Sequence, residues 1–319
     1  MKHKLQAFVA IGALSYSTPT LAQSCAEFTA SSAELRLYYD PYEGASLERT
    51  FTLRVRQLDS AVTGVRFLLA DPDPEGSRPR LGINGPAYEM VWARDSGRRI
   101  FALGGEQPNN TNGALVRFGS TGSSKVADEV FRVRVPAGED LAAGNYYQPI
   151  DIVYQCFAGD DAVDGARIQS DGRVAVDLVV PERVTSYIGS QGIRRGTLDF
   201  GSLVANSNNI SRSLSITTQA TVPYEVEFST LHGSLKRSGD DPASIPYRSW
   251  FANLPVRDGS RVGCARSSAP RGSVNVLRAE VDGRAAASVP AGTYGEEITI
   301  TFSPRLGLSG GNGCSALRY

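Results

Sequence analysis

Two stretches of the sequence decide the fold, AGNYYQPIDIVY at 143–154 and PAGTYGEEITITF at 290–302. In both, an Ala-Gly pair and a Tyr precede apolar residues that alternate with other residues. Alternation with a period of two predicts half-buried strands of antiparallel sheets. The pattern recurs along the chain, for example in FTLRV at 51–55 and FRVRV at 131–135. Because no stretch has a convincing helical period, we predict an all-β protein.

The two stretches belong to a longer internal repeat. Residues 35–53 align without gaps with 198–216, and residues 143–154 align with 291–302. Blocks that recur in the same order indicate a duplicated domain. We therefore predict two tandem immunoglobulin-like β-sandwich domains, at 23–181 and 182–319. The matches that carry the alignment are Leu37 with Phe200, Phe51 with Leu214, Leu53 with Ile216, Val65 with Val226, Phe67 with Phe228, Ile150 with Ile298, Ile152 with Ile300 and Tyr154 with Phe302.

The second domain is expected to lack its final strand. In the first copy a further alternating strand, RVAVDLVV at 173–180, follows the repeated segment, and its counterpart would begin beyond Tyr319. A sandwich without its last strand exposes unpaired backbone groups beside an apolar groove. A strand donated by another chain can complete such a sheet. We expect this donor-strand groove to be lined by Phe200, Leu214, Ile216, Ile298, Ile300 and Phe302.

The N-terminal segment predicts export. Lys2 and Lys4 precede a short apolar run, and small and polar residues follow up to Ala22, which is the pattern of a secretory signal peptide over residues 1–22. The next strand is expected near Ala33, so no alternating arm is left to donate to a neighbour. A subunit that accepts a strand and offers none is expected at one end of a polymer.

Four cysteines in an exported protein indicate disulfides. Three pairings are possible, and the one that keeps each bond within one copy joins Cys25 to Cys156 and Cys264 to Cys314. Cys314 lies in a Gly- and Ser-rich tail. This tail leaves an alternative open, in which it folds back over the groove and closes the second domain.

The composition argues against catalysis and against nucleic acid as a partner. The chain has 33 basic and 33 acidic residues, so no basic excess favours nucleic acid or an anionic membrane. Of its two histidines only His232 follows the predicted signal peptide, so any triad or histidine metal site would have to be built on this one residue, which we expect in a solvated turn. Asp71, Asp73 and Glu75 resemble a calcium loop, but prolines interrupt them. We predict no enzyme activity, no metal and no cofactor.

The second domain resembles the spore coat U domain family, whose members include subunits of archaic chaperone-usher pili. The resemblance implies a two-domain pilus tip adhesin, with a first domain that binds abiotic or host surfaces through apolar loops. It also implies a second domain that accepts the next pilin's donor strand, with a periplasmic chaperone and an outer-membrane usher as partners. Thr217 and Thr218 depart from the family, whose domains often carry a cysteine there. The resemblance rests on LDFGS at 198–202, SLSITTQATVPYEVEFS at 213–229, IPYRSWFANL at 245–254 and VPAGTYGEEITITF at 289–302.

Two segments of the first domain are candidates for its binding surface. The loop at 157–171 should lie at the end away from the second domain, and a solvated turn is its equally plausible alternative. The Pro- and Gly-rich segment at 70–92 looks like an insertion relative to the second domain, although Tyr88, Met90 and Trp92 alternate like a core strand. A self-contained secreted surface or coat protein is the alternative to the adhesin. The candidate binding residues are Phe157, Ala158, Ala162, Val163, Leu81 and Ile83.

Overall fold

The computed structural model describes residues 24–317 except 33, 72–78, 83, 103–104, 120–124, 164, 204–207, 240–241 and 308–312. The predicted signal peptide, Ile83, and Asp73 and Glu75 of the calcium-like segment therefore lie outside the described residues. The prediction of an all-β fold is confirmed, because strands in several sheets account for nearly all regular structure and α1 (Gly283–Ala287) is a single short helix. No described helix is long and apolar enough to cross a membrane.

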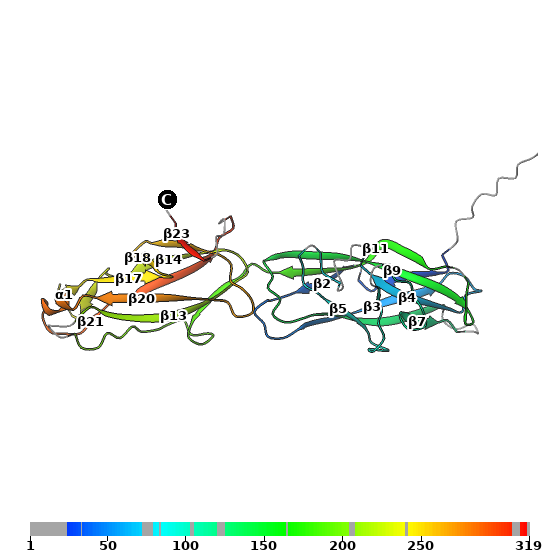
Figure 1. The fold of residues 1–319 in the computed structure, drawn as a ribbon, viewed down its shortest axis with the longest axis horizontal. Coiled ribbons are helices and arrows are strands. Elements are labelled where there is room, and N and C mark those ends of the chain that lie inside the picture. The colour runs from blue at the N-terminus through cyan, green and yellow to red at the C-terminus, as the bar shows by residue number, and fades with distance from the viewer. Residues whose placement is uncertain are drawn as a thin grey trace, which may run out of the picture.

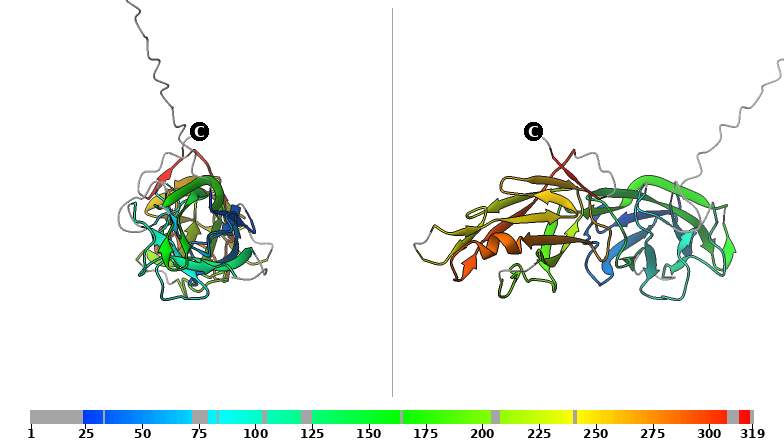
Figure 2. Two further views of the ribbon diagram at one scale, coloured as in Figure 1. Left: turned by 90° about the vertical axis from the view of Figure 1, so that its right-hand side faces the viewer. Right: turned by 60° about the vertical axis from the view of Figure 1, so that its left-hand side comes forward.

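The strands form two lobes joined end to end, with most strands running along the long axis (Figures 1 and 2). The first lobe contains a four-stranded sheet in the order β1-β3-β8-β5. Its second sheet has the order β2-β11-β9-β4-β6, with β7 also on β4 and β10 on β9. The strands are β1 (Ala26–Ala30), β2 (Glu34–Tyr38), β3 (Leu47–Gln57), β4 (Gly64–Ala70), β5 (Glu89–Trp92), β6 (Phe101–Ala102), β7 (Ala114–Arg117), β8 (Val126–Val135), β9 (Gly144–Ala158), β10 (Asp161–Ala162) and β11 (Arg167–Val180).

The second lobe repeats this plan in a reduced form. It has one sheet in the order β12-β13-β20-β17-β18, one in the order β22-β14-β19-β23, and a small sheet β16-β15-β21. No described sheet mixes strands of the two lobes, which is compatible with the predicted domains; their boundary at 181/182 stays a prediction. The strands are β12 (Val184–Ile188), β13 (Ile210–Ala220), β14 (Tyr224–Thr230), β15 (Leu235–Arg237), β16 (Ser244–Ile245), β17 (Tyr247–Phe251), β18 (Leu254–Val256), β19 (Arg261–Cys264), β20 (Ser273–Val281), β21 (Tyr294–Gly295), β22 (Ile298–Pro304) and β23 (Cys314–Ala316).

Alternation along the strands builds the core of the first lobe. Phe51, Leu53 and Val55 of β3 point inward and are buried. The outward residues between and beside them are charged or hydroxylated, and Arg54 donates to Asp128 of β8 at 2.8 Å. Burial of each inward side chain stabilises the fold by about 1.5–3 kcal/mol. The sandwich therefore follows directly from the period-two pattern.

The repeat is visible in the strand pairing. Phe51 faces Phe131 across β3 and β8, and its sequence match Leu214 faces Leu277 across β13 and β20. One part of the alignment is wrong by two residues: Phe67 faces Tyr154, whereas its match Phe228 faces Ile300 and not Phe302. A slip of two residues keeps every side chain on the same face, so the sequence pattern alone does not detect it.

The position of the insertion in the first lobe also differs from the prediction. The β4–β5 connection (71–88) is nearly as short as its counterpart between β14 and β17 (231–246). The β5–β7 connection spans 93–113, whereas its counterpart between β17 and β19 spans only 252–260. The first-lobe insertion is therefore 93–113 and not the Pro- and Gly-rich segment at 70–92.

Polar contacts fix the junction between the lobes. The Tyr42 hydroxyl lies 2.9 Å from the Ala220 carbonyl oxygen and 2.8 Å from that of Ser267, and it accepts the Ala220 amide at 3.1 Å. Asp140 accepts the Arg266 guanidinium at 2.6 Å. Burial raises the pKa of Asp140, but hydrogen bonds from Arg266 and the Ala269 amide, with the Arg266 charge, outweigh it and lower that pKa overall. The two lobes thus meet through specific bonds as well as through the chain connection.

We expect Tyr42→Phe to lower the free energy of unfolding of the full chain by about 1–2 kcal/mol, because backbone groups at the junction lose their partner. Urea unfolding measures this loss. Tyr38→Phe is the matched control, since Tyr38 is 64% exposed. Equal effects of the two substitutions would show that the Tyr42 hydroxyl does not hold the lobes together.

Candidate functional site: an open groove and an apolar tip

Strand β11 completes the second sheet of the first lobe. It runs parallel to β2, with Leu178 opposite Leu37, and antiparallel to β9, with Leu178 opposite Tyr146. Its inward residues Val174, Val176, Leu178 and Val180 are buried. One strand therefore satisfies the backbone groups of two neighbours and fills the core with four apolar side chains.

The corresponding position in the second lobe is open. Strand β22, the counterpart of β9, pairs with β14 along one edge. Within the described residues no strand pairs with its other edge, and the segment 198–203, which matches β2, forms no strand. An edge with unpaired N–H and C=O groups is a template for another strand.

A groove of about 1730 Å³ follows this edge. It is larger than the roughly 300–1,000 Å³ of most small-molecule sites, and residues 298–302 of β22 line it. The structure brings all six residues predicted for a donor-strand groove into its lining, namely Phe200, Leu214, Ile216, Ile298, Ile300 and Phe302. Their role in binding a strand stays a prediction.

Burial differs between matching positions of the two lobes. Leu37 and Phe51 of the first lobe are 1% and 5% exposed, but their matches Phe200 and Leu214 are only half-buried. The half-buried Ile300 likewise occupies the register position of Tyr154, which is buried. The groove thus leaves apolar surface partly in contact with water, and covering it is favourable.

Polar groups near the groove are engaged in structural roles. Glu296 accepts hydrogen bonds from the backbone amides of His232 and Ser234, each at 3.0 Å to one of its carboxylate oxygens. Burial, with the charges of Glu296 and Asp258, raises the pKa of Tyr247 to about 12, so this phenol is neutral at physiological pH. Among the described residues no three metal-ligating side chains lie together.

The C-terminal tail lies on the far edge of the same sheet. Strand β23 pairs with β19, and the sheet order β22-β14-β19-β23 separates it from the groove by two strands. Cys314 is joined to Cys264 in the predicted disulfide. The described part of the tail, residues 313–317, therefore does not cover the groove edge.

The predicted binding loop forms the end of the first lobe away from the junction. We name residues 157–163 the tip hairpin; in it Ala162 pairs with Phe157. Phe157 is half-buried, Ala158 and Ala162 are exposed, and Val163 is 46% exposed. These four predicted residues lie together, while their contact with a surface stays a prediction.

Two further exposed apolar residues of the first lobe, one of them five residues after the tip hairpin in the chain, were missed by the sequence analysis. Ile168, at the start of β11, is 66% exposed and Leu58 is 44% exposed. The Leu58 amide donates to the Cys25 carbonyl at 2.9 Å and the Val163 amide to the Cys156 carbonyl at 3.0 Å. Because Cys25 and Cys156 form the other predicted disulfide, this bond ties both loops together.

Leu81 is not part of a binding surface, and that prediction is wrong. It is fully buried, and the amide of the following Gly82 donates to Gln148 near the start of β9, at the opposite end of that strand from Cys156. Its backbone turns into the lobe, where Leu81 joins the core. Tyr88, Met90 and Trp92 are buried, as their alternation indicated.

No family model and no curated protein matches the chain. The solved structures that resemble it include the following three, each matched over most of both chains. The CupB6 tip adhesin from Pseudomonas aeruginosa is 13% identical with a TM-score of 0.42, over 87% of this chain and 94% of that one. The CsuC–CsuE chaperone–tip subunit complex of archaic Csu pili of Acinetobacter baumannii is 12% identical with a TM-score of 0.39, over 86% of this chain and 99% of that one. The enterotoxigenic E. coli adhesin CfaE is 12% identical with a TM-score of 0.36, over 87% of this chain and 93% of that one. At these values the similarities assign neither a family nor a function.

We expect the double substitution Cys264→Ser with Cys314→Ser to lower the free energy of unfolding by about 2–4 kcal/mol through loss of the cross-link. Hydrogen exchange should become faster at 261–264, beside β23. Exchange at 298–304 should not change under native conditions, because β22 lies on the other edge of the sheet. Altered native-state exchange at 298–304 would mean that the tail shields the groove.

Proposed function

We propose that this chain is a non-catalytic tip adhesin of an archaic chaperone-usher pilus. Its second lobe accepts a donor strand from the adjacent pilin, and its first lobe attaches to abiotic or host surfaces through the tip hairpin. The observation that carries the proposal is the open edge of β22, at the position that β11 fills in the first lobe. Export across the periplasm, a periplasmic chaperone and an outer-membrane usher are part of the proposal.

The energetics favour a strand as the occupant of the groove. In the first lobe the same position is occupied by a strand with four buried apolar side chains. Each such side chain contributes about 1.5–3 kcal/mol when fully buried, and part of this gain offsets the loss of freedom of the incoming strand. Main-chain hydrogen bonds to β22 would provide affinity, and the alternating side chains would provide register.

The second candidate is a self-contained exported surface or coat protein. The observation in its favour is the disulfide between Cys264 and Cys314, which anchors the tail to the second lobe without any partner. In that case the groove is only a shallow, hydrated surface. The two functions differ in whether the second lobe responds to an added strand.

A peptide that copies residues 173–180, RVAVDLVV, should stabilise the full chain in a saturable manner. We expect about 2.7 kcal/mol at a peptide concentration of 100 times its dissociation constant, measured from the unfolding transition of the second lobe within the full chain. The control peptide carries Ser at the four inward positions. An Ile300→Asp chain is a second control, because a carboxylate in the groove opposes an apolar strand.

A cooperative, monomeric second lobe that ignores the peptide would favour the coat protein over the adhesin. Stabilisation by both peptides would indicate nonspecific binding. Only a response that needs the apolar positions of the peptide and Ile300 of the chain agrees with strand addition in this groove.

The double substitution Val163→Ser with Ile168→Ser should weaken binding of the full chain to polystyrene beads about tenfold, because two exposed apolar side chains lose the area they would bury. Val130→Ser is the matched control, since Val130 is 41% exposed on a different sheet. Bead binding is measured by depletion of protein from solution. Equal binding of all three chains would remove the tip hairpin from the proposal.

A further inference from the structure

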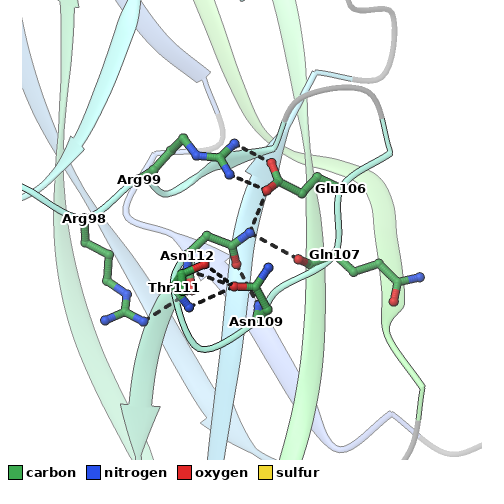
Figure 3. Close-up of polar contacts among 7 residues, drawn as sticks. All are labelled: Arg98, Arg99, Glu106, Gln107, Asn109, Thr111 and Asn112. Carbon is green, nitrogen blue, oxygen red and sulfur yellow. Dashed lines mark hydrogen bonds and ion pairs between the residues drawn. The ribbon is translucent and has the colours of Figure 1, made fainter.

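Polar side chains in the described part of the insertion at 93–113, between Arg98 and Asn112, form a clasp at the edge of the second sheet (Figure 3). Arg99 forms an ion pair with Glu106, and Glu106 accepts the buried Asn112 side chain at 2.8 Å. The Asn109 side chain accepts the Thr111 amide at 2.8 Å. These groups satisfy one another, so the clasp has the character of a rigid support.

The same insertion reaches a buried arginine of the sheet. Arg66, on β4, is only 9% exposed, and its Nη1 donates to the Asn110 side chain at 2.7 Å. The neighbouring Arg98 holds the turn by donating to the carbonyl oxygens of Gly113 at 2.6 Å and of Asn110 at 2.9 Å. Gly113 has a φ of 76°, and a Cβ there would lie 2.9 Å from the Phe67 carbonyl oxygen, so the clasp requires glycine at this point.

Arg66 forms no ion pair with a described carboxylate, and its buried Nε has no hydrogen-bond partner. Burial, with the charges of Arg98 and Arg117, lowers the pKa of Arg66. A buried cation without a counter-charge is unfavourable. If Arg66 served only stability, an apolar side chain of similar length would serve better. Stability alone therefore does not account for an arginine at this position.

The guanidinium of Arg66 lies 5.2 Å from the centre of the Phe157 ring. Phe157 is the first residue of the tip hairpin and pairs with Gly64 of β4, two residues before Arg66. A cation at this distance over an aromatic ring attracts it, and more strongly where water is excluded. Arg66 thus connects the insertion, through Asn110, to the tip hairpin, through Phe157.

We propose that Arg66 is a positioning residue for the tip hairpin: the insertion orients its guanidinium through Asn110, and the guanidinium holds Phe157 in place. This inference rests on the proposed function where it concerns adhesion, but the conformational part stands on its own. It assigns to the insertion, which the second lobe lacks, the task of fixing the orientation of the binding end.

The test is Arg66→Met in the full chain, with three measurements. Hydrogen exchange at 157–163, where the Val163 amide donates to Cys156 and the Gly159 amide donates to the Thr63 hydroxyl, should become about tenfold faster, which corresponds to about 1.4 kcal/mol. The midpoint of thermal unfolding should stay the same or rise, because a buried unpaired charge is removed. Bead binding should fall.

Matched variants separate the contributions of Arg66. Arg66→Lys keeps the charge but loses the planar group that bonds Asn110, and should speed exchange in the same segment by a smaller factor. Asn110→Ala changes an exposed residue and should act in the same direction. Arg54→Met removes a cation from the other sheet and should leave exchange at 157–163 unchanged.

Unchanged exchange at 157–163 in Arg66→Met and Asn110→Ala would overturn the inference, whatever happens to bead binding. A fall in thermal stability that accelerates exchange throughout the first lobe would also overturn it, since Arg66 would then be a general structural residue. Faster local exchange with unaltered bead binding would support the positioning role and count against the tip hairpin as the adhesive surface. Failure of the positioning role is therefore distinguishable from failure of the proposed adhesive surface.

Discussion

In the first lobe a strand lies between β2 and β9 and pairs with both, and the rest of this molecule depends on whether that position is filled in each lobe. In the first lobe β11 supplies the strand, so that Leu178 is buried and both neighbouring edges are paired. In the second lobe β22 keeps a free edge within the described residues, and the matching apolar residues stay half-buried. The sheet edge is thus paired in the first lobe and unpaired, within the described residues, in the second.

This difference separates the tasks of the two lobes. A closed sandwich can carry an inserted clasp and exposed apolar residues at its end, because its core does not depend on another molecule. An open sandwich has an incomplete core and gains stability from whatever strand completes it. Under the proposed function, attachment belongs to the first lobe and assembly to the second.

Much of this architecture could be predicted from the sequence, because a period of two reports burial directly. Five of the six groove residues come together since each lies on the inward face of β13 or β22, as the alternation indicated, whereas Phe200 lines the groove from a segment that forms no strand. The same periodicity hides the shift that puts Ile300, and not Phe302, opposite Phe228, because a slip of two residues conserves the face. The sequence also could not predict with which edge strand the Cys314 tail pairs, since a short Gly-rich segment specifies no pairing partner.

The errors in the first lobe have a common physical origin. Leu81 stands among Pro and Gly residues that indicate an exposed loop, but a turn can still direct a single apolar side chain into the core. Ile168 shows the converse, because this apolar residue is 66% exposed although it pairs with Val153 of β9 within the sheet. Composition describes the average exposure of a segment, whereas contacts from distant elements decide the individual residue.

The junction determines how these parts act together. Tyr42 contacts Ala220 at the end of β13, and the Ala143 amide, just before β9, donates to the Thr221 carbonyl at 2.9 Å. Strand β9 ends in the tip hairpin, and β13 contributes Leu214 and Ile216 to the groove. Two strands that meet at the junction therefore extend to the two proposed binding regions.

Under the proposed function, a load applied at the tip would pass along β9 to the junction and then along β13 to the bound donor strand, through backbone ladders aligned with the long axis (Figure 1). The hydrogen bonds at Tyr42 and Thr221 lie on that path, which gives a physical reason for a bonded connection between the lobes in place of a free linker.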